Sequence, residues 1–118
     1  MEIVLYQPEI AGNVGAIIRL AANSGVSLNL IKPFGFDLQE NKIRRAGLDY
    51  HDLSNTKTYN SWEEFIKTNK DKSICCLSSK GIDSYWDTNL NQYDFLLFGP
   101  ESIGLPAEII SSYKTITI

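Results

Sequence analysis

Arg19 and Asn23 are the first side chains in this sequence whose type and spacing could do chemistry. They fall four residues apart within residues 13–23, a segment whose apolar side chains recur at helical spacing. That apolar stripe consists of Val14, Ile17, Ile18 and Ala21. The spacing leaves the two polar residues on another face of the predicted helix. A guanidinium presents a fixed fork of donors that suits phosphate, and Gly15 would let a ligand approach closely. The alternative is an exposed arginine paired with a carboxylate.

A second candidate is the loop of residues 98–106, where two glycines and two prolines surround Glu101. The loop follows an apolar run and precedes a predicted helix. Glycine and proline fix an unusual backbone path, which can present N–H groups to a ligand. The Glu101 carboxylate can accept a hydrogen bond from a hydroxyl or an amine, or balance a positive charge on a ligand. The alternative is a plain connector, with Pro106 at the first helical position.

A small basic cluster follows the second predicted strand. Its cations are Lys42, Arg44 and Arg45, on a predicted short helix at residues 38–46, with Tyr50 and His51 nearby. Such a cluster could contact RNA phosphates and stack on bases. Three cations on a short helix also fit an ordinary solvated face.

Several other chemistries are disfavoured. Ser78 could suggest a nucleophile, but nothing in the sequence brings His51 beside it, and a catalytic triad requires that geometry. No phosphate-binding loop ending in GK[ST] exists, and no G-x-G-x-x-G motif follows the first strand, which argues against nucleoside triphosphates and NAD. His51 is the only histidine, which excludes sites built on several imidazoles, so we expect no metal.

The composition indicates a compact domain spanning residues 1–118. Its 43% hydrophobic and 21% charged residues are typical of a folded chain. Because the formal net charge is −3, a contact with nucleic acid must come from a local patch or a dimer groove. The apolar runs are too short to span a bilayer, and the first residues lack the pattern of a secretion signal. Cys75 and Cys76 are neighbours in a predicted strand, which would point them to opposite faces, so we expect free thiols and a cytoplasmic location.

Strands and helices alternate along the chain. The predicted strands are residues 2–6, 27–31, 56–59, 73–78, 93–98 and 114–118. The first predicted helix starts near Asn13 and ends at Gly25, and the second covers residues 38–46. The third begins after a capping box of Ser61 and Glu64, and the fourth runs from Pro106 to Ser111. This order predicts an α/β fold with an open, mostly parallel, Rossmann-like sheet. Ligands bind such sheets at the carboxyl ends of the strands, so the candidate loops are 7–12, 78–81 and 99–106.

The predicted last strand, residues 114–118, is followed by no helix that could cover it. Parallel sheets normally have both faces covered. We therefore expect that the chain is a fragment, or that its covering element comes from elsewhere.

Three motifs in the same order resemble those of a known family. They are residues 3–10 with the Asn13-x-Gly15-x-Ile17-Ile18-Arg19 segment, residues 44–51, and residues 98–106. Over its whole length the chain is similar to bacterial tRNA (cytidine/uridine-2′-O)-methyltransferases of the SPOUT, or trefoil-knot, superfamily. The resemblance implies an enzyme that uses S-adenosylmethionine to methylate the ribose 2′-hydroxyl of the wobble nucleotide in certain leucine tRNAs. It also implies a homodimer, and a Rossmann-like sheet with a C-terminal knot.

The resemblance also implies roles for individual residues. Leu77, Gly99 and Ile118 would line the cofactor site. Arg19, with Asn13 near it, would face the RNA and the reacting hydroxyl, and Glu101 would lie beside them in the second motif. Arg44 and Arg45 would contact tRNA. A guanidinium stays protonated in proteins, so we expect Arg19 to orient phosphate and stabilise developing alkoxide charge rather than to act as a base.

The sequence departs from these relatives at its end. Family members continue past the position of Ile118 into a Ser-x-Asn-x-Ser motif and a helix that complete the knot, so we expect an incomplete knot and weak cofactor binding in this chain. An inactive, truncated member that keeps some tRNA binding is therefore an alternative. A flavodoxin-like binding module is a more distant one, because it rests only on the alternation of strands and helices.

Overall fold

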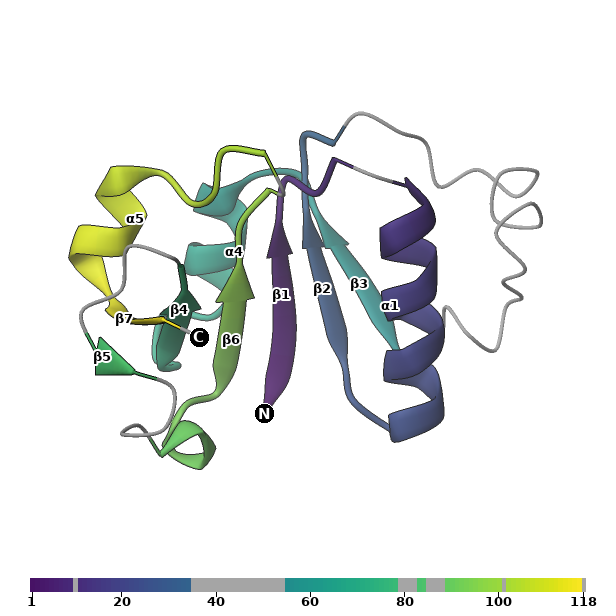
Figure 1. Cartoon of the computed structure of the whole chain (residues 1–118), viewed down its shortest axis with the longest axis horizontal. Helices are drawn as coiled ribbons and strands as arrows, with labels where there is room; N and C mark the ends of the chain where they lie inside the picture. The colour runs from purple at the N-terminus through teal and green to yellow at the C-terminus, as the bar shows by residue number, and fades with distance from the viewer. Residues whose placement is uncertain (10, 35–54, 79–82, 85–88, 101, 118) are drawn as a thin grey trace.

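A parallel sheet of seven strands forms the centre of the part of the chain that the structure describes (Figure 1). The structure is a computed structural model, and it describes residues 1–9, 11–34, 55–78, 83–84, 89–100 and 102–117. The strands are β1 (Glu2–Tyr6), β2 (Leu28–Ile31), β3 (Thr56–Tyr59), β4 (Ile74–Leu77), β5 (Asp83–Ser84), β6 (Phe95–Phe98) and β7 (Lys114–Thr117). Their order is β3-β2-β1-β6-β4-β7-β5, and every pair is parallel. The predicted α/β fold is confirmed.

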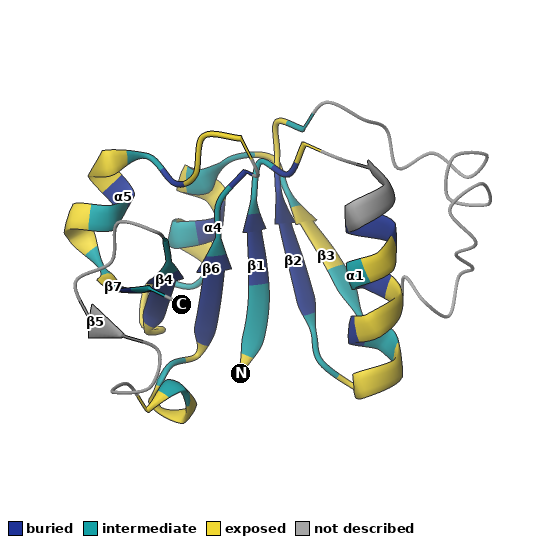
Figure 2. Cartoon of the chain, viewed as in Figure 1, coloured by how far each residue is buried: buried dark blue, intermediate teal, exposed yellow. Residues whose placement is uncertain are grey.

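Helix α1 (Ala11–Ser24) covers one face of the sheet. Its predicted stripe is the buried face, with Val14 and Ile18 almost fully enclosed. These side chains pack on Leu5, Leu28 and Leu30, which alternate toward this side of their strands. The opposite side of α1 is exposed to solvent (Figure 2).

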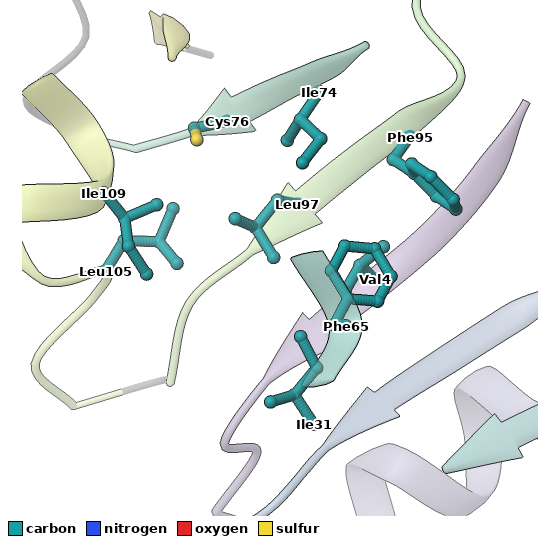
Figure 3. Close-up of a cluster of buried hydrophobic side chains, with 9 residues drawn as sticks. All are labelled: Val4, Ile31, Phe65, Ile74, Cys76, Phe95, Leu97, Leu105 and Ile109. Atoms are coloured by element: carbon teal, nitrogen blue, oxygen red, sulfur yellow. The ribbon is translucent and has the colours of Figure 1, made fainter. Parts of the chain in front are cut away.

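The other face of the sheet is covered by α4 (Trp62–Thr68) and α5 (Ala107–Ser112). Phe65 of α4 and Ile109 of α5 enter a cluster of nine buried side chains between these helices and the strands (Figure 3). Phe65 is fully buried and lies 5.0 Å, centroid to centroid, from both Phe95 and Tyr59. Cys76 belongs to this cluster and Cys75 to the opposite face, as predicted for neighbours in a strand.

The ends of two helices follow their sequence signals. After α1, Gly25 has φ +71°, and Val26 N–H donates to the Ala21 carbonyl at 3.0 Å, which is the Schellman arrangement. The Ser61 hydroxyl accepts from Glu64 N–H at 3.0 Å and so caps α4. The Glu64 carboxylate reaches back to Asn60 N–H at 2.6 Å, one residue before the cap. Helix α1 begins at Ala11, two residues before the predicted start at Asn13, because the loop after β1 is shorter than its small residues suggested.

The last strand, β7, occupies residues that the sequence predicted to be a strand. Strand β7 lies inside the sheet, between β4 and β5, and its Ile116 is fully buried. Cys75 and Leu96 pack around Ile116, with Leu77, Leu90, Tyr93 and Phe98 at the margin. The cover of Ile116 therefore comes from residues of neighbouring strands and of the segment before β6. The sequence pattern missed the two-residue β5 and a 3-10 turn at Leu90–Gln92, which are too short for a periodic signal.

The order of the strands changes direction beside β1. Strands β2 and β3 continue to one side of it, whereas β6 and β4 continue to the other. The carboxyl ends of β1 and β6 therefore meet at a topological switch point, where open α/β sheets bind ligands.

Candidate functional site

The loops that follow β1 and β6 meet at this switch point. The parallel register pairs Leu5 with Phe98, so both strands end at the same edge of the sheet. The chain turns sharply after β1, where Gln7 has φ +45° and donates its N–H to the Ile31 carbonyl at 2.9 Å. A non-glycine residue with positive φ is uncommon and marks a position that the surrounding structure fixes.

Glu9 joins the two loops directly. Its carboxylate accepts a hydrogen bond from Ser102 N–H at 2.9 Å and from the Ser102 hydroxyl at 2.7 Å. The backbone hydrogen bond, followed by that of the hydroxyl, holds the pKa of Glu9 below its ordinary value. Glu9 is therefore a carboxylate that fixes the middle of the 99–106 loop against the start of α1. Sequence reasoning missed this contact, because 93 residues separate its two partners.

The loop of residues 99–106 is also tied to itself. Gly104 N–H donates to the Pro100 carbonyl at 2.9 Å, and Gly104 adopts φ +71°. The returning chain passes so close to Gly99 that a Cβ there would lie 2.5 Å from the Leu105 nitrogen. Leu105 is buried against the α5 side of the sheet. The two glycines thus allow a compact turn in place of an extended connector.

The residues predicted to line a cofactor site lie at the ends of three adjacent strands. Leu77 is the last residue of β4, and its register partners are Phe98 of β6 and Ile116 of β7. Gly99 follows Phe98 directly, and Ser78 N–H donates to the Ile116 carbonyl at 3.0 Å. The sheet therefore brings Leu77, Gly99 and the end of β7 to one edge, whereas Ile118 lies outside the described residues.

The structure describes only some of the predicted catalytic and RNA-binding residues. Arg19 lies on the exposed side of α1, one helical turn before Asn23, which is exposed as well. By helix geometry it stands roughly 12 Å along the axis from Ala11, away from the loop edge. Asn13 lies in the first turn of α1, but its side chain is outside the described part of the chain. Glu101, Arg44 and Arg45 are also outside the described residues.

Among the described residues, no three His, Cys, Asp or Glu side chains gather as a metal site would require. No helix in the same part of the chain is long and apolar enough to cross a membrane.

Comparison with known proteins gives consistent matches. The sequence profile of the SpoU rRNA Methylase family matches residues 1–118. A tRNA (cytidine(34)-2'-O)-methyltransferase from Saccharophagus degradans is 44% identical over 108 residues, covering 92% of this chain and 70% of that protein. The protein of the same name from Escherichia coli K12 is 39% identical over 112 residues, covering 95% of this chain and 71% of its own length.

Solved structures share the fold. One, described as structural insights into the 2-OH methylation of C/U34 on tRNA, has a TM-score of 0.88 at 39% identity, covering 99% of this chain and 78% of that one. The SpoU methyltransferase AviRb from Streptomyces viridochromogenes, in complex with AdoMet, has a TM-score of 0.82 at 22% identity, covering 100% of this chain and 48% of that one. At that identity, the second match supports the fold alone.

Proposed function

Because this chain belongs to the SpoU rRNA Methylase family, we propose that residues 1–118 form a methyltransferase domain that modifies tRNA. The reaction transfers a methyl group from S-adenosylmethionine to the ribose 2′-hydroxyl of nucleotide 34, the wobble nucleotide, of leucine tRNAs. The observation that carries the proposal is the shared edge at which Leu77, Gly99 and the end of β7 meet, beside the loop that Glu9 holds. The names of the relatives support the choice of tRNA and of nucleotide 34.

The chemistry of this edge fits a cofactor such as S-adenosylmethionine. Its described side chains, Leu77, Ser78 and Thr117, are apolar or uncharged, and strand ends supply backbone donors and acceptors. Adenine and ribose need this combination of apolar contact and a few placed polar groups. We assign the contacts to Leu77, Gly99 and Ile118. Bound there, the cofactor would supply an electrophilic methyl group on a sulfonium, with the neutral thioether as the leaving group.

In this reaction the chain's own residues position the RNA and balance the charge that develops on the 2′-oxygen. Because Arg19 stands away from the loop edge of its own chain, we assign it to the site of the second copy in the proposed homodimer. There it orients the RNA phosphate and stabilises negative charge on the 2′-oxygen, since its guanidinium cannot accept a proton. Asn13 lies six residues before Arg19 in α1. Glu101 precedes Ser102, the residue that Glu9 binds. The Glu9 contact fixes the position of Ser102, which matters because small misplacements near a reacting centre are costly in catalysis.

Binding of tRNA by an acidic chain requires local cations, which we assign to Arg19, Arg44 and Arg45. We also propose a homodimer that uses the outer side of α1, where Leu20 is 66% exposed next to Arg19. A second copy packed on this side would remove the Leu20 side chain from water, which favours the contact. The two free buried cysteines and a tRNA substrate support a cytoplasmic location.

Methyl incorporation into tRNA tests the proposal. The chain, extended at its C-terminus by the Ser-x-Asn-x-Ser motif and helix of its relatives, is incubated with labelled S-adenosylmethionine and leucine tRNA. It is compared with the same extended form carrying Arg19→Ala or the matched substitution Lys70→Ala. Lys70 is an exposed cation just after α4, on the other side of the sheet. We expect the extended chain and Lys70→Ala to incorporate label and Arg19→Ala to lose it while keeping its circular dichroism spectrum. Equal incorporation by Arg19→Ala would remove Arg19 from the mechanism, and binding of tRNA without any incorporation would favour an inactive member of the family.

A further inference from the structure

A cavity of about 430 Å³ opens between the start of α4 and helix α5, on the face of the sheet opposite α1. Its lining residues include Tyr6 and Gln7 at the end of β1, and Ile109 of α5. Leu77, Gly99 and Arg19 are not among its lining residues, so it is separate from the site proposed for methyl transfer. Its volume lies within the range of small-molecule sites in proteins, roughly 300–1,000 Å³.

Three aromatic rings form walls of this cavity. Tyr6 and Trp62 have ring centroids 5.9 Å apart and planes at 74°. Trp62 and Tyr113 are 6.0 Å apart at 86°. Both tyrosine rings are therefore steeply inclined to the plane of the indole ring. Phe65 stacks on Trp62 at 5.6 Å and 26°, and this contact anchors the indole to the core.

Two carboxylates lie among the same lining residues. Glu63 belongs to the first turn of α4, and Glu108 to the first turn of α5. Within the part of the chain that the structure describes, no hydrogen bond or ion pair involves either carboxylate, although Lys32 also lines the cavity. Burial first, and then the charges of Glu63 and Glu108, raise the pKa of Tyr6, which indicates a negative potential at its hydroxyl.

We propose that this cavity binds a small organic cation, with the ammonium group held against Tyr6, Trp62 and Tyr113 and balanced by Glu63 and Glu108. Aromatic faces attract cations through their quadrupole, and unpaired carboxylates add a longer-range attraction. The same two carboxylates disfavour a phosphate or a nucleic acid backbone at this position. The proposal does not depend on the methyltransferase activity, because the two sites share none of the residues assigned to them.

Binding of choline tests the proposal, with 3,3-dimethylbutan-1-ol as a neutral probe of nearly the same shape. The readout is the indole N–H resonance of Trp62, assigned with a Trp62→Phe variant. We expect saturable binding of choline that is roughly tenfold tighter than that of the neutral alcohol, since cation–π attraction in a partly desolvated site has about this size. This binding test does not use methyltransferase activity, so the absence of choline binding would leave the proposed methyl transfer unaffected.

Charge variants distinguish the contribution of the carboxylates to choline binding from that of the shape of the cavity. The double variant Glu63→Gln and Glu108→Gln should fold normally, because both side chains are exposed and without described partners. It should lose most of the preference for choline. Asp71→Asn, an exposed carboxylate outside the cavity, should keep it. Equal affinity for both probes, an unchanged preference in the double variant, or no choline binding would each overturn the proposal.

Discussion

Replacing Gly99 with alanine adds one carbon at the point where the turn after β6 folds back on its own strand. That Cβ would lie 2.5 Å from the Leu105 nitrogen, 2.6 Å from the Gly104 carbonyl carbon and 3.0 Å from Leu105 Cγ. Ordinary contacts of a Cβ begin at 3.4 Å. Two of the three neighbours are backbone atoms, so no side-chain rotation relieves the overlap. The turn must instead move outward by about 1 Å.

The size of the effect follows from that displacement. Overpacking of this kind costs about 1–3 kcal/mol, and in a domain of this length 1 kcal/mol lowers the Tm by roughly 4 °C. We therefore expect Gly99→Ala to lower the Tm by roughly 4–12 °C. The turn carries Ser102, so its movement also breaks the contact with Glu9. A shift of about 1 Å near a reacting centre can reduce the rate by about a hundredfold, and we expect a loss of that order in kcat/KM for tRNA methylation.

Gly25→Ala is the matched control. Gly25 has φ +71°, and a Cβ there would meet nothing within 4 Å. Alanine at this position costs about 1 kcal/mol of backbone strain and displaces no neighbour. Gly25 lies after the last turn of α1, at the opposite end of that helix from Glu9. Its variant should lose a few degrees in Tm by differential scanning calorimetry and keep wild-type kcat/KM.

The reasoning would be refuted by a Gly99→Ala chain whose Tm lies within about 1 °C of the wild type and whose kcat/KM is unchanged. That result would mean that the turn has room beside Gly99. A loss of stability with unchanged kcat/KM would refute a narrower point, namely that the position of this turn matters for methyl transfer.

Further predictions concern a carboxylate, a thiol and the core. Because Ser102 lowers the pKa of Glu9 from an ordinary 4.5, the contact stabilises the folded loop above pH 4.5 and is lost as the pH falls through the lower folded-state value. An NMR titration should find the pKa of Glu9 below 4.5, and Ser102→Ala should move it only part of the way back, since the backbone hydrogen bond remains; a wild-type value at or above 4.5 would contradict this. Burial raises the pKa of Cys76 to about 11, so roughly one thiol in a thousand is ionised at pH 8. Iodoacetamide should therefore modify Cys76 only after unfolding, and equal rates in native and unfolded chains would disprove the assignment. Phe65→Ala removes a fully buried ring and should cost about 3–5 kcal/mol in urea unfolding, whereas a cost under about 1 kcal/mol would show that the core collapses around the gap.

Local patterns in the sequence predicted those parts of the fold that depend on local forces. The apolar stripe of α1 and the glycine that ends it are confirmed, because helical periodicity and a left-handed cap are properties of a few consecutive residues. The buried runs that became β4 and β6 were identified for the same reason. The position of β7 between β4 and β5 was not predictable in this way, since strand order is set by packing between distant segments.

The candidate site was predicted less completely than the fold. Its cofactor residues came from the resemblance of three motifs, and the register of β4, β6 and β7 brings Leu77 and Gly99 together. The Glu9–Ser102 contact left no signal in the sequence, because a glutamate and a serine are ordinary loop residues until the sheet brings their loops to one edge. The cavity beside α4 was missed because the spacing of Trp62 and Phe65 in sequence indicated only a buried helix face, and Tyr6 and Tyr113 join them from other elements.

The position of the transferred methyl group tests the central claim most directly. Leucine tRNA is incubated with methyl-labelled S-adenosylmethionine and the chain extended at its C-terminus by the Ser-x-Asn-x-Ser motif and helix of its relatives. The tRNA is then digested, and its nucleosides are identified by mass spectrometry. We predict a single labelled product, methylated on the ribose 2′-oxygen of nucleotide 34. Label on a base or on another nucleotide, or tRNA that stays unlabelled with the folded chain, would contradict the proposed function.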